Sequence, residues 1–227
     1  MLAWLENKDP FPPVERALKN PNGLLAAGGE LSLERLLEAY RRGVFPWYSG
    51  AEPVLWWSPD PRMVLYCEEL KVPRSLAKNV RNKGFEVRVD TAFAAVLDGC
   101  ADRPQTWLGS DMRKAYLRLH RAGYAHSFET WRERELVGGL YGVSIGRMFY
   151  GESMFSRATD ASKVALVALV GELRTRGVPL IDCQMHTPLL ASLGAREIPR
   201  RTFLRELAAL VNYPASSGKW NRSSVKT

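Results

Sequence analysis

Hydrophobic and polar positions follow two different periods along the chain, which indicates a fold with both helices and strands. Apolar side chains recur three and four residues apart within residues 33–40, a spacing that predicts a helix with Ser32 as its N-cap and Gly43 at its end. The same criteria predict, in chain order, strands at 63–66 and 85–89, helices from 91 and at 112–121, strands at 125–131, 136–145 and 148–151, a helix at 161–176, a strand at 179–184, a short helix opened by Thr187 and ended by Gly194, and a helix at 202–211. Hairpin-linked strands mixed with helices indicate an α+β, or mixed α/β, fold class.

The character of the sequence changes near residue 62, which predicts two domains and a tail. Residues 1–62 hold one helix and a block rich in Pro, Gly and aromatic residues, and we expect them to form a small N-terminal domain. Residues 63–213 carry the mixed helices and strands of a second domain. Residues 214–227 are polar and low in apolar content, which predicts a disordered tail.

The aromatic block, residues 43–62, reads G-V-F-P-W-Y-S-G-A-E-P-V-L-W-W-S-P-D-P-R and combines five large aromatic residues with four prolines and two glycines. So much Pro and Gly predicts an irregular, rigid loop, which can present flat rings to a ligand. A base of a nucleic acid is one such ligand, and Trp47 is the best candidate to stack on it. Alternatively, Trp56 and Trp57 fill a gap between the two domains.

The chain is basic, with 32 Lys and Arg against 24 Asp and Glu and a formal net charge of +8. Part of this charge is concentrated near a predicted helix, where Arg74, Lys78 and Arg81 share one face and Lys83 follows. Like charges on one face repel each other, so folding alone does not call for this arrangement. We therefore interpret the face as a phosphate-binding surface, with an ordinary solvated surface as the alternative.

Several other classes of protein find no support in the sequence. No apolar run approaches the roughly 18 residues that cross a bilayer, and the N-terminus carries acids and a proline, so we expect a cytoplasmic protein. Three cysteines and three histidines are scattered, which predicts neither a disulfide framework nor a metal site; they are Cys67, Cys100, Cys183, His120, His126 and His186.

Polar side chains interrupt the apolar segment L-I-D-C-Q, residues 180–184. Because alternate residues of a strand share a face, Asp182 and Gln184 are expected on one side, and Ile181 and Cys183 on the other. A carboxylate and an amide in an apolar segment need partners. The pair is either a catalytic element or a structural hydrogen-bonded pair.

These two segments belong to a larger distinctive set, which comprises N-G-L-L-A-A-G-G-E-L, G-V-F-P-W-Y, W-W-S-P-D-P-R, H-S-F-E-T-W, L-V-G-G-L-Y-G-V, G-E-S-M-F-S-R, A-S-K, L-I-D-C-Q and S-L-G-A-R-E-I-P-R-R. From about residue 11 to residue 211, the chain closely resembles the leucyl/phenylalanyl-tRNA–protein transferase family. The resemblance implies transfer of leucine or phenylalanine from tRNA to proteins with an N-terminal Arg or Lys, which creates a degradation signal. It also implies a GNAT-like second domain, related to the peptidoglycan Fem transferases.

The resemblance implies a role for each candidate site residue. In the mechanism proposed for the family, Asp182 polarises Gln184, whose carbonyl takes up a proton from the attacking amine. Since an amide oxygen is a very poor base, we favour Gln184 as the group that orients a neutral amine; proton transfer through a ribose hydroxyl is equally open. The other roles are a donor side-chain pocket of Leu140, Met154, Leu166 and Leu169, adenosine binding by Trp47, Trp107 and Tyr116, and binding of the basic N-terminal residue by Glu152. The alternatives are an ordinary core for the leucines and a salt bridge to a neighbouring arginine for Glu152.

Two other functions remain open at this point. A coenzyme A-dependent GNAT acetyltransferase is one, but its pyrophosphate is held by a glycine-rich turn, and the matching segment here, S-R-A-T-D-A-S-K, has no glycine. We therefore expect no coenzyme A and no other cofactor. The other function is that of a non-catalytic protein that binds tRNA or single-stranded RNA, but such a function does not explain the Asp182–Gln184 pair. The preference among Leu, Phe and Met, the natural protein targets and the oligomeric state cannot be read from the sequence.

Overall fold

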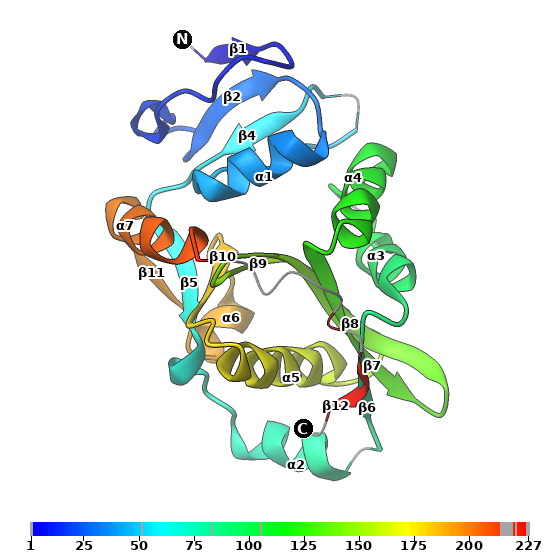
Figure 1. The fold of residues 1–227 in the computed structure, drawn as a ribbon. Helices are drawn as coiled ribbons and strands as arrows, with labels where there is room; N and C mark the ends of the chain where they lie inside the picture. Colours follow the sequence, from blue (N-terminus) through cyan, green and yellow to red (C-terminus); the bar gives the residue numbers. More distant parts are fainter. Residues whose placement is uncertain are drawn as a thin grey trace.

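The structure, a computed structural model, describes residues 2–50, 52–82, 84–104, 106–213, 220 and 222–225. Its secondary structure confirms the mixed α/β class (Figure 1). In chain order the elements are β1 (Ala3–Leu5), η1 (Val14–Arg16), β2 (Leu24–Gly28), α1 (Leu33–Arg41), β3 (Phe45–Pro46), β4 (Leu55–Trp57), β5 (Arg62–Tyr66), η2 (Cys67–Glu69), α2 (Arg74–Asn82), β6 (Glu86–Val89), α3 (Phe93–Ala101), α4 (Ser110–Arg121), β7 (Ala125–Arg132), β8 (Glu135–Ile145), β9 (Met148–Ser156), α5 (Ala161–Thr175), β10 (Leu180–Gln184), α6 (Pro188–Ser192), β11 (Arg196–Ile198), α7 (Arg200–Val211) and β12 (Arg222–Val225).

The N-terminal sheet has the order β1-β2-β4-β3 and is covered by α1 on the side of the larger sheet (Figure 1). Helix α1 begins as the sequence predicts, because the Ser32 hydroxyl accepts a hydrogen bond from the main-chain N–H of Arg35. Its apolar face is buried, and it contacts α4 and α7 as well as β3. The helix thus joins the N-terminal sheet to the rest of the fold.

The larger sheet has the order β11-β5-β10-β9-β8-β7-β6-β12. Helix α5 packs against β7 and β8 on one face, and α3 and α4 cover the other face (Figure 1). Helix α5 is apolar around most of its circumference, which is typical of a helix buried in a core. Two hydrophobic clusters therefore sandwich the centre of this sheet.

Strands β9 and β10, in the centre of the larger sheet, pair over only part of their length. Strands β9 and β10 are parallel neighbours with Leu180 opposite Met148, Ile181 opposite Phe149 and Asp182 opposite Tyr150. Strand β9 continues to Ser156, whereas β10 ends at Gln184. The sheet consequently has a gap beyond these three pairs, and the candidate site lies there.

The C-terminal segment differs from the sequence prediction. Trp220 is buried, its ring stacks on His126 with centroids 4.1 Å apart, and the Arg176 guanidinium lies 4.3 Å from the Trp220 ring centroid. Strand β12 pairs antiparallel with β6 at the edge of the sheet. The expected disorder therefore does not hold at these residues. The tail is polar on average, but the single large ring of Trp220 is buried and the open edge of the sheet offers β12 a strand to pair with. Residues 214–219, 221 and 226–227 lie outside the described residues.

No helix in the described part of the chain is long and apolar enough to cross a membrane.

Candidate active site

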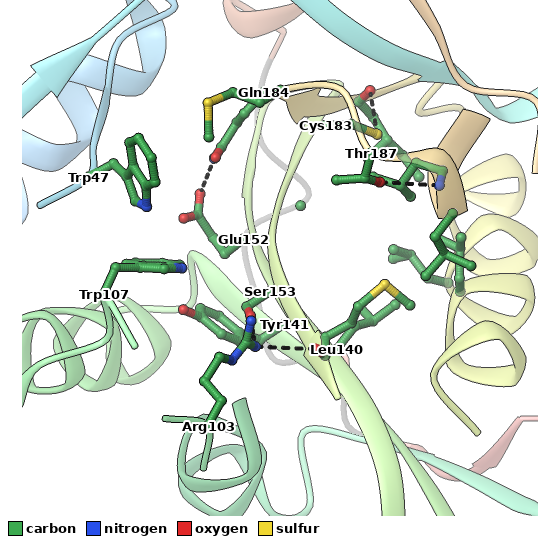
Figure 2. Close-up of a pocket in the computed structure, with 18 of the residues that line it drawn as sticks. Trp47, Arg103, Trp107, Leu140, Tyr141, Glu152, Ser153, Cys183, Gln184 and Thr187 are labelled. Carbon is green, nitrogen blue, oxygen red and sulfur yellow. Dashed lines mark hydrogen bonds between the residues drawn. The ribbon is translucent and has the colours of Figure 1, made fainter. Parts of the chain in front are cut away.

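A pocket of about 310 Å³ lies in the gap between β9 and β10, facing the loop that follows β3. Figure 2 shows the indoles of Trp47 and Trp107 on one side of it, Leu140 on the other, and Glu152 and Gln184 between them. Residues from both sheets and from α5 and α6 therefore line one space. The pocket brings together most of the site residues predicted from the sequence.

The apolar side of the pocket includes the four residues predicted to bind a donor side chain, together with Ile181, Leu189 and Leu190. Leu140 and Met154 are opposite each other on β8 and β9, and Leu166 and Leu169 follow one face of α5. The leucines are buried and also belong to the core between α5 and the sheet. This side of the pocket is thus a hollow in the core, shaped to bury an apolar group.

The tryptophans of the aromatic block occupy different environments. Trp56 is fully buried and donates a hydrogen bond to the Gly28 carbonyl. Trp57 is buried and donates to the carbonyl of Trp47 at 2.6 Å, which fixes the main chain beneath Trp47. Trp47 itself is 37% exposed and lines the pocket, so it is the ring of the three that a ligand can reach.

Trp107 lines the pocket, whereas Tyr116 lies behind it. The Tyr116 side chain is fully buried, and its ring meets the edge of Trp107 with centroids 6.3 Å apart. A buried ring offers no open face for a base. Its hydroxyl instead donates a hydrogen bond to Glu152 at 2.5 Å.

Glu152 is the extra residue of a β-bulge. Tyr141 pairs with Ser153, whereas the next residue, Gly142, pairs with Gly151, so Glu152 has no opposite residue on β8. Only glycine fits at position 142, because a Cβ there would collide with the Tyr150 carbonyl oxygen. The bulge frees the Glu152 side chain from the regular alternation of β9 and lets it turn into the pocket.

Three hydrogen-bond donors surround the Glu152 carboxyl group. Tyr40 donates to Oε1 at 2.8 Å, Gln184 Nε2 donates to Oε1 at 3.0 Å, and Tyr116 donates to Oε2. Burial raises the pKa of Glu152 to about 7, against the opposing effect of these hydrogen bonds, which stabilise the ionised form. Glu152 therefore changes charge near neutral pH.

Strand β10 does not place Asp182 and Gln184 side by side, so the expected alternation is wrong at this point. Gln184 has a left-handed main chain, with φ of 65°, and the pairing of β10 with β5 shifts between Asp182 and Gln184. Cys183 consequently lines the pocket together with Gln184, while Asp182 does not. Asp182 accepts a hydrogen bond from the main-chain N–H of Gln184 at 2.9 Å, not from its side chain.

Two partners in this network carry no local sequence signal. Arg62 forms an ion pair with Asp182 from 120 positions away, and Tyr40 reaches Glu152 from 112 positions away. Both lie next to segments that the sequence analysis identified, since Arg62 ends the aromatic block and Tyr40 ends the apolar face of α1. Only the folded sheet brings them to the site.

The basic face is separate from the pocket. Arg74, Lys78 and Arg81 are exposed on α2, at the opposite end of the molecule from the N-terminal sheet (Figure 1). Lys83 lies outside the described residues. Among the described side chains, no group of three or more His, Cys, Asp or Glu could hold a metal ion.

The pocket thus combines an apolar hollow with two indoles and a carboxyl group whose burial raises its pKa. Comparisons with known proteins show the family to which the chain belongs. Residues 64–208 match the family model described as leucyl/phenylalanyl-tRNA protein transferase, and residues 29–60 match that of its N-terminal domain. The chain therefore belongs to the leucyl/phenylalanyl-tRNA–protein transferase family and is a transferase enzyme.

Relatives with this name are similar over nearly their whole length. The leucyl/phenylalanyl-tRNA–protein transferase of Thiobacillus denitrificans is 61% identical over 96% of this chain and 97% of its own. That of Chromobacterium violaceum is 58% identical over 97% of both chains.

Solved structures are less similar. L-PGS from Bacillus licheniformis is 11% identical, covers 74% of this chain and 57% of its own, and has a TM-score of 0.41. A GCN5-related N-acetyltransferase-like protein from Streptococcus suis is 14% identical, covers 73% and 63%, and has a TM-score of 0.38.

Proposed function

We propose that this enzyme moves leucine or phenylalanine, and to a smaller extent methionine, from aminoacyl-tRNA to the α-amine of proteins with an N-terminal Arg or Lys. The new N-terminal residue marks the acceptor protein for degradation by the N-end rule, and we place the reaction in the cytoplasm. The observation that carries this proposal is the pocket, which joins an apolar hollow, two reachable indoles and the Glu152–Gln184 pair in one space.

The donor occupies both ends of the pocket. Its amino-acid side chain enters the hollow of Leu140, Met154, Leu166 and Leu169, where flexible Met154 adapts to Leu or Phe. The terminal adenine stacks on the indole of Trp47, with Trp107 beside it. The phosphates of the tRNA body bind the exposed cations of α2.

The reaction needs little activation from the protein. The α-amine attacks the ester carbonyl carbon, and the bond between that carbon and the ribose oxygen breaks. The amine loses one proton and the ribose oxygen gains one, so the tRNA leaves with a free hydroxyl group. Because the pKa of an α-amine is about 7.7–8.0, roughly a fifth to a third of it is neutral near pH 7.4. Holding this neutral amine in line with the ester is therefore the main task.

Gln184 is suited to orient the amine. Its Nε2 donates to Glu152, so its Oε1 faces away from that carboxyl group, and Oε1 accepts no hydrogen bond from the described residues. An ionised carboxylate only accepts hydrogen bonds, which fixes this orientation of the amide. The amide oxygen of Gln184 then receives an N–H of the incoming amine. Asp182 supports this geometry through the Gln184 main chain.

Glu152 binds the basic N-terminal residue of the acceptor. Its two oxygens offer about four acceptor positions, and three are used by Tyr40, Tyr116 and Gln184. The remaining position is open to a guanidinium or ammonium group, which in turn favours the ionised form of Glu152.

The test is transfer of labelled leucine from charged tRNA to four peptides that differ only in their N-terminal residue, Arg, Lys, Asp or Ala. We expect label on the Arg and Lys peptides only. Ribonuclease abolishes the transfer, and acetyl-coenzyme A does not support it. Equal labelling of all four peptides contradicts the acceptor specificity, and no labelling of any of them contradicts the proposed reaction.

A further inference from the structure

One buried hydroxyl group in the pocket has no partner. Tyr141 is fully buried and lines the pocket, yet its Oη makes no hydrogen bond within the described residues. Within the described part of the chain, unpaired buried side-chain atoms also occur in Arg35 and Ser58, and neither residue lines the pocket. Burying an unpaired hydroxyl costs free energy, and a phenylalanine would fill the same space without that cost. The hydroxyl of Tyr141 is therefore expected to serve a ligand.

The rings packed against Tyr141 give its hydroxyl no hydrogen-bond partner. Its ring makes T-shaped contacts with the rings of Phe93 and Tyr116, with centroids 5.9 and 5.1 Å away, and its hydroxyl finds no partner among the described residues. Tyr40 and Tyr116 direct their hydroxyls to Glu152, whereas Tyr141 does not. Burial raises the pKa of Tyr141 well above its usual value, so the phenol stays protonated and can both donate and accept.

The position of Tyr141 in β8 indicates which part of a donor it meets. Leu140 and Tyr141 are consecutive in the strand and thus point to opposite faces of the sheet. Leu140 belongs to the hollow against α5, and Tyr141 belongs to the cluster that contains Tyr116 and Trp107. Figure 2 shows the phenol of Tyr141 on the side of the pocket where Trp107 and Glu152 lie.

The sugar of a bound adenosine lies between its base and the ester bond. In the protein, Tyr116 lies behind the pocket and links its parts, since its ring contacts both Trp107 and Tyr141 and its hydroxyl bonds Glu152. We infer that the Tyr141 hydroxyl hydrogen-bonds the free ribose 2′-hydroxyl of the terminal adenosine of the aminoacyl-tRNA. This inference rests on the proposed use of aminoacyl-tRNA as the donor.

The test uses Tyr141→Phe and two probes, the stable 3′-leucyl amide of 3′-amino-3′-deoxyadenosine and the same compound without its 2′-hydroxyl. We expect Tyr141→Phe to weaken binding of the first probe about three- to tenfold, the usual effect of one neutral hydrogen bond, and to leave binding of the second unchanged. The KM for charged tRNA rises similarly, and the KM for the acceptor peptide does not change. The matched control is Tyr66→Phe, because the Tyr66 hydroxyl bonds Glu206 and does not line the pocket.

Each result decides the question. Tyr141→Phe unfolds at the same temperature as the wild type or higher, since it removes an unpaired polar group; a lower unfolding temperature means that the hydroxyl has a partner in the protein and overturns the inference. Equal affinity of variant and wild type for the first probe also overturns it, as does an equal loss for both probes. If the wild type binds neither probe, the proposed donor fails, and that result is distinct from a failure of Tyr141 alone.

Discussion

Arg62 and Asp182 form a two-point ion pair inside the protein. Arg62 Nε lies 2.7 Å from Oδ1 and Nη2 lies 2.6 Å from Oδ2, and the exposed fractions of the two side chains are 1% and 0%. The third nitrogen of Arg62 donates to the carbonyl of Gly43, and the guanidinium lies 4.7 Å from the ring of Phe45. Gly43 and Phe45 both precede Trp47 by a few positions. One guanidinium thus joins the base of the Trp47 loop to the strand that carries Gln184.

Removing only one member of this pair is expected to destabilise the fold. Arg62→Met leaves a buried carboxylate unpaired, so we expect the free energy of unfolding to fall by about 3–5 kcal/mol in urea denaturation. Adding Asp182→Leu removes the second charge, and the double variant should regain most of that stability. Its transfer rate should stay low, because the main chain of Gln184 has lost its acceptor. A double variant no more stable than Arg62→Met contradicts the role of the ion pair.

Substitutions of Gln184 separate an orienting role from an obligatory base. Gln184→Ala should lower kcat about 10²-fold, since the amine is no longer held in line with the ester. Gln184→Glu keeps an oxygen in place and should retain measurable transfer. Its pH optimum moves upward, because two neighbouring carboxyl groups share a proton and one of their pKa values rises. Neither change disturbs Asp182, which bonds the main-chain N–H. Wild-type rates in folded Gln184→Ala from pH 6 to 9 make Gln184 structural.

The charge of Glu152 gives the reaction a specific pH dependence. With a pKa of about 7, Glu152 is protonated below pH 7 and loses its attraction for a basic acceptor, so binding of Arg peptides strengthens as the pH rises through 7. Glu152→Gln should bind these peptides weakly at every pH. The ratio of the wild-type kcat/KM to that of the variant reports the charge of Glu152 alone, because the ionisation of the acceptor amine affects both enzymes equally. A ratio that stays constant from pH 5.5 to 8 contradicts this role.

Loss of the exposed indole in the pocket should weaken use of the donor. We expect Trp47→Ala to raise the KM for charged tRNA by a factor that corresponds to about 1–3 kcal/mol, the usual loss for a base-stacking ring. Trp4→Ala is the control, since Trp4 is an exposed tryptophan on β1 that does not line the pocket. Equal kinetics of the two variants at limiting tRNA would return Trp47 to a purely structural role.

Charge reversal on α2 distinguishes binding of the tRNA body from chemistry. Changing Arg74, Lys78 and Arg81 to Glu should raise the KM for charged tRNA and flatten its salt dependence, because each phosphate contact releases counterions. Transfer from a minimal aminoacyl-adenosine should be nearly intact, since that donor lacks the phosphates. The control reverses three exposed cations elsewhere, Arg16, Lys19 and Arg132. Loss of transfer from both donors indicates misfolding instead.

Local patterns predicted the helices and most strands of the larger sheet. Helices α1 and α5 follow from apolar spacing within a few turns, and the four apolar pocket residues follow from the family resemblance. The short strands β1, β2, β3, β4, β11 and β12 escaped prediction, since two to five residues carry too little periodicity. The prediction of an irregular loop at residues 43–62 is wrong at β3 and β4, because both strands pair within the N-terminal sheet despite the prolines around them.

The geometry of the site could not be predicted in the same way. Two bulges determine it, one at Glu152 and one beside Gln184, and a bulge breaks the alternation on which strand predictions depend. The partners Arg62 and Tyr40 are distant in sequence, so no local pattern indicates them.

The adjacent residues Leu140 and Tyr141 line the same pocket from opposite faces of one sheet. On the proposed binding mode, the face toward α5 selects the amino acid and the face toward α4 selects the nucleoside that carries it. The two selections therefore draw on different parts of the core and can change independently. Substitutions along α5 should alter which amino acid is transferred while every charged tRNA is still held by its common 3′ end.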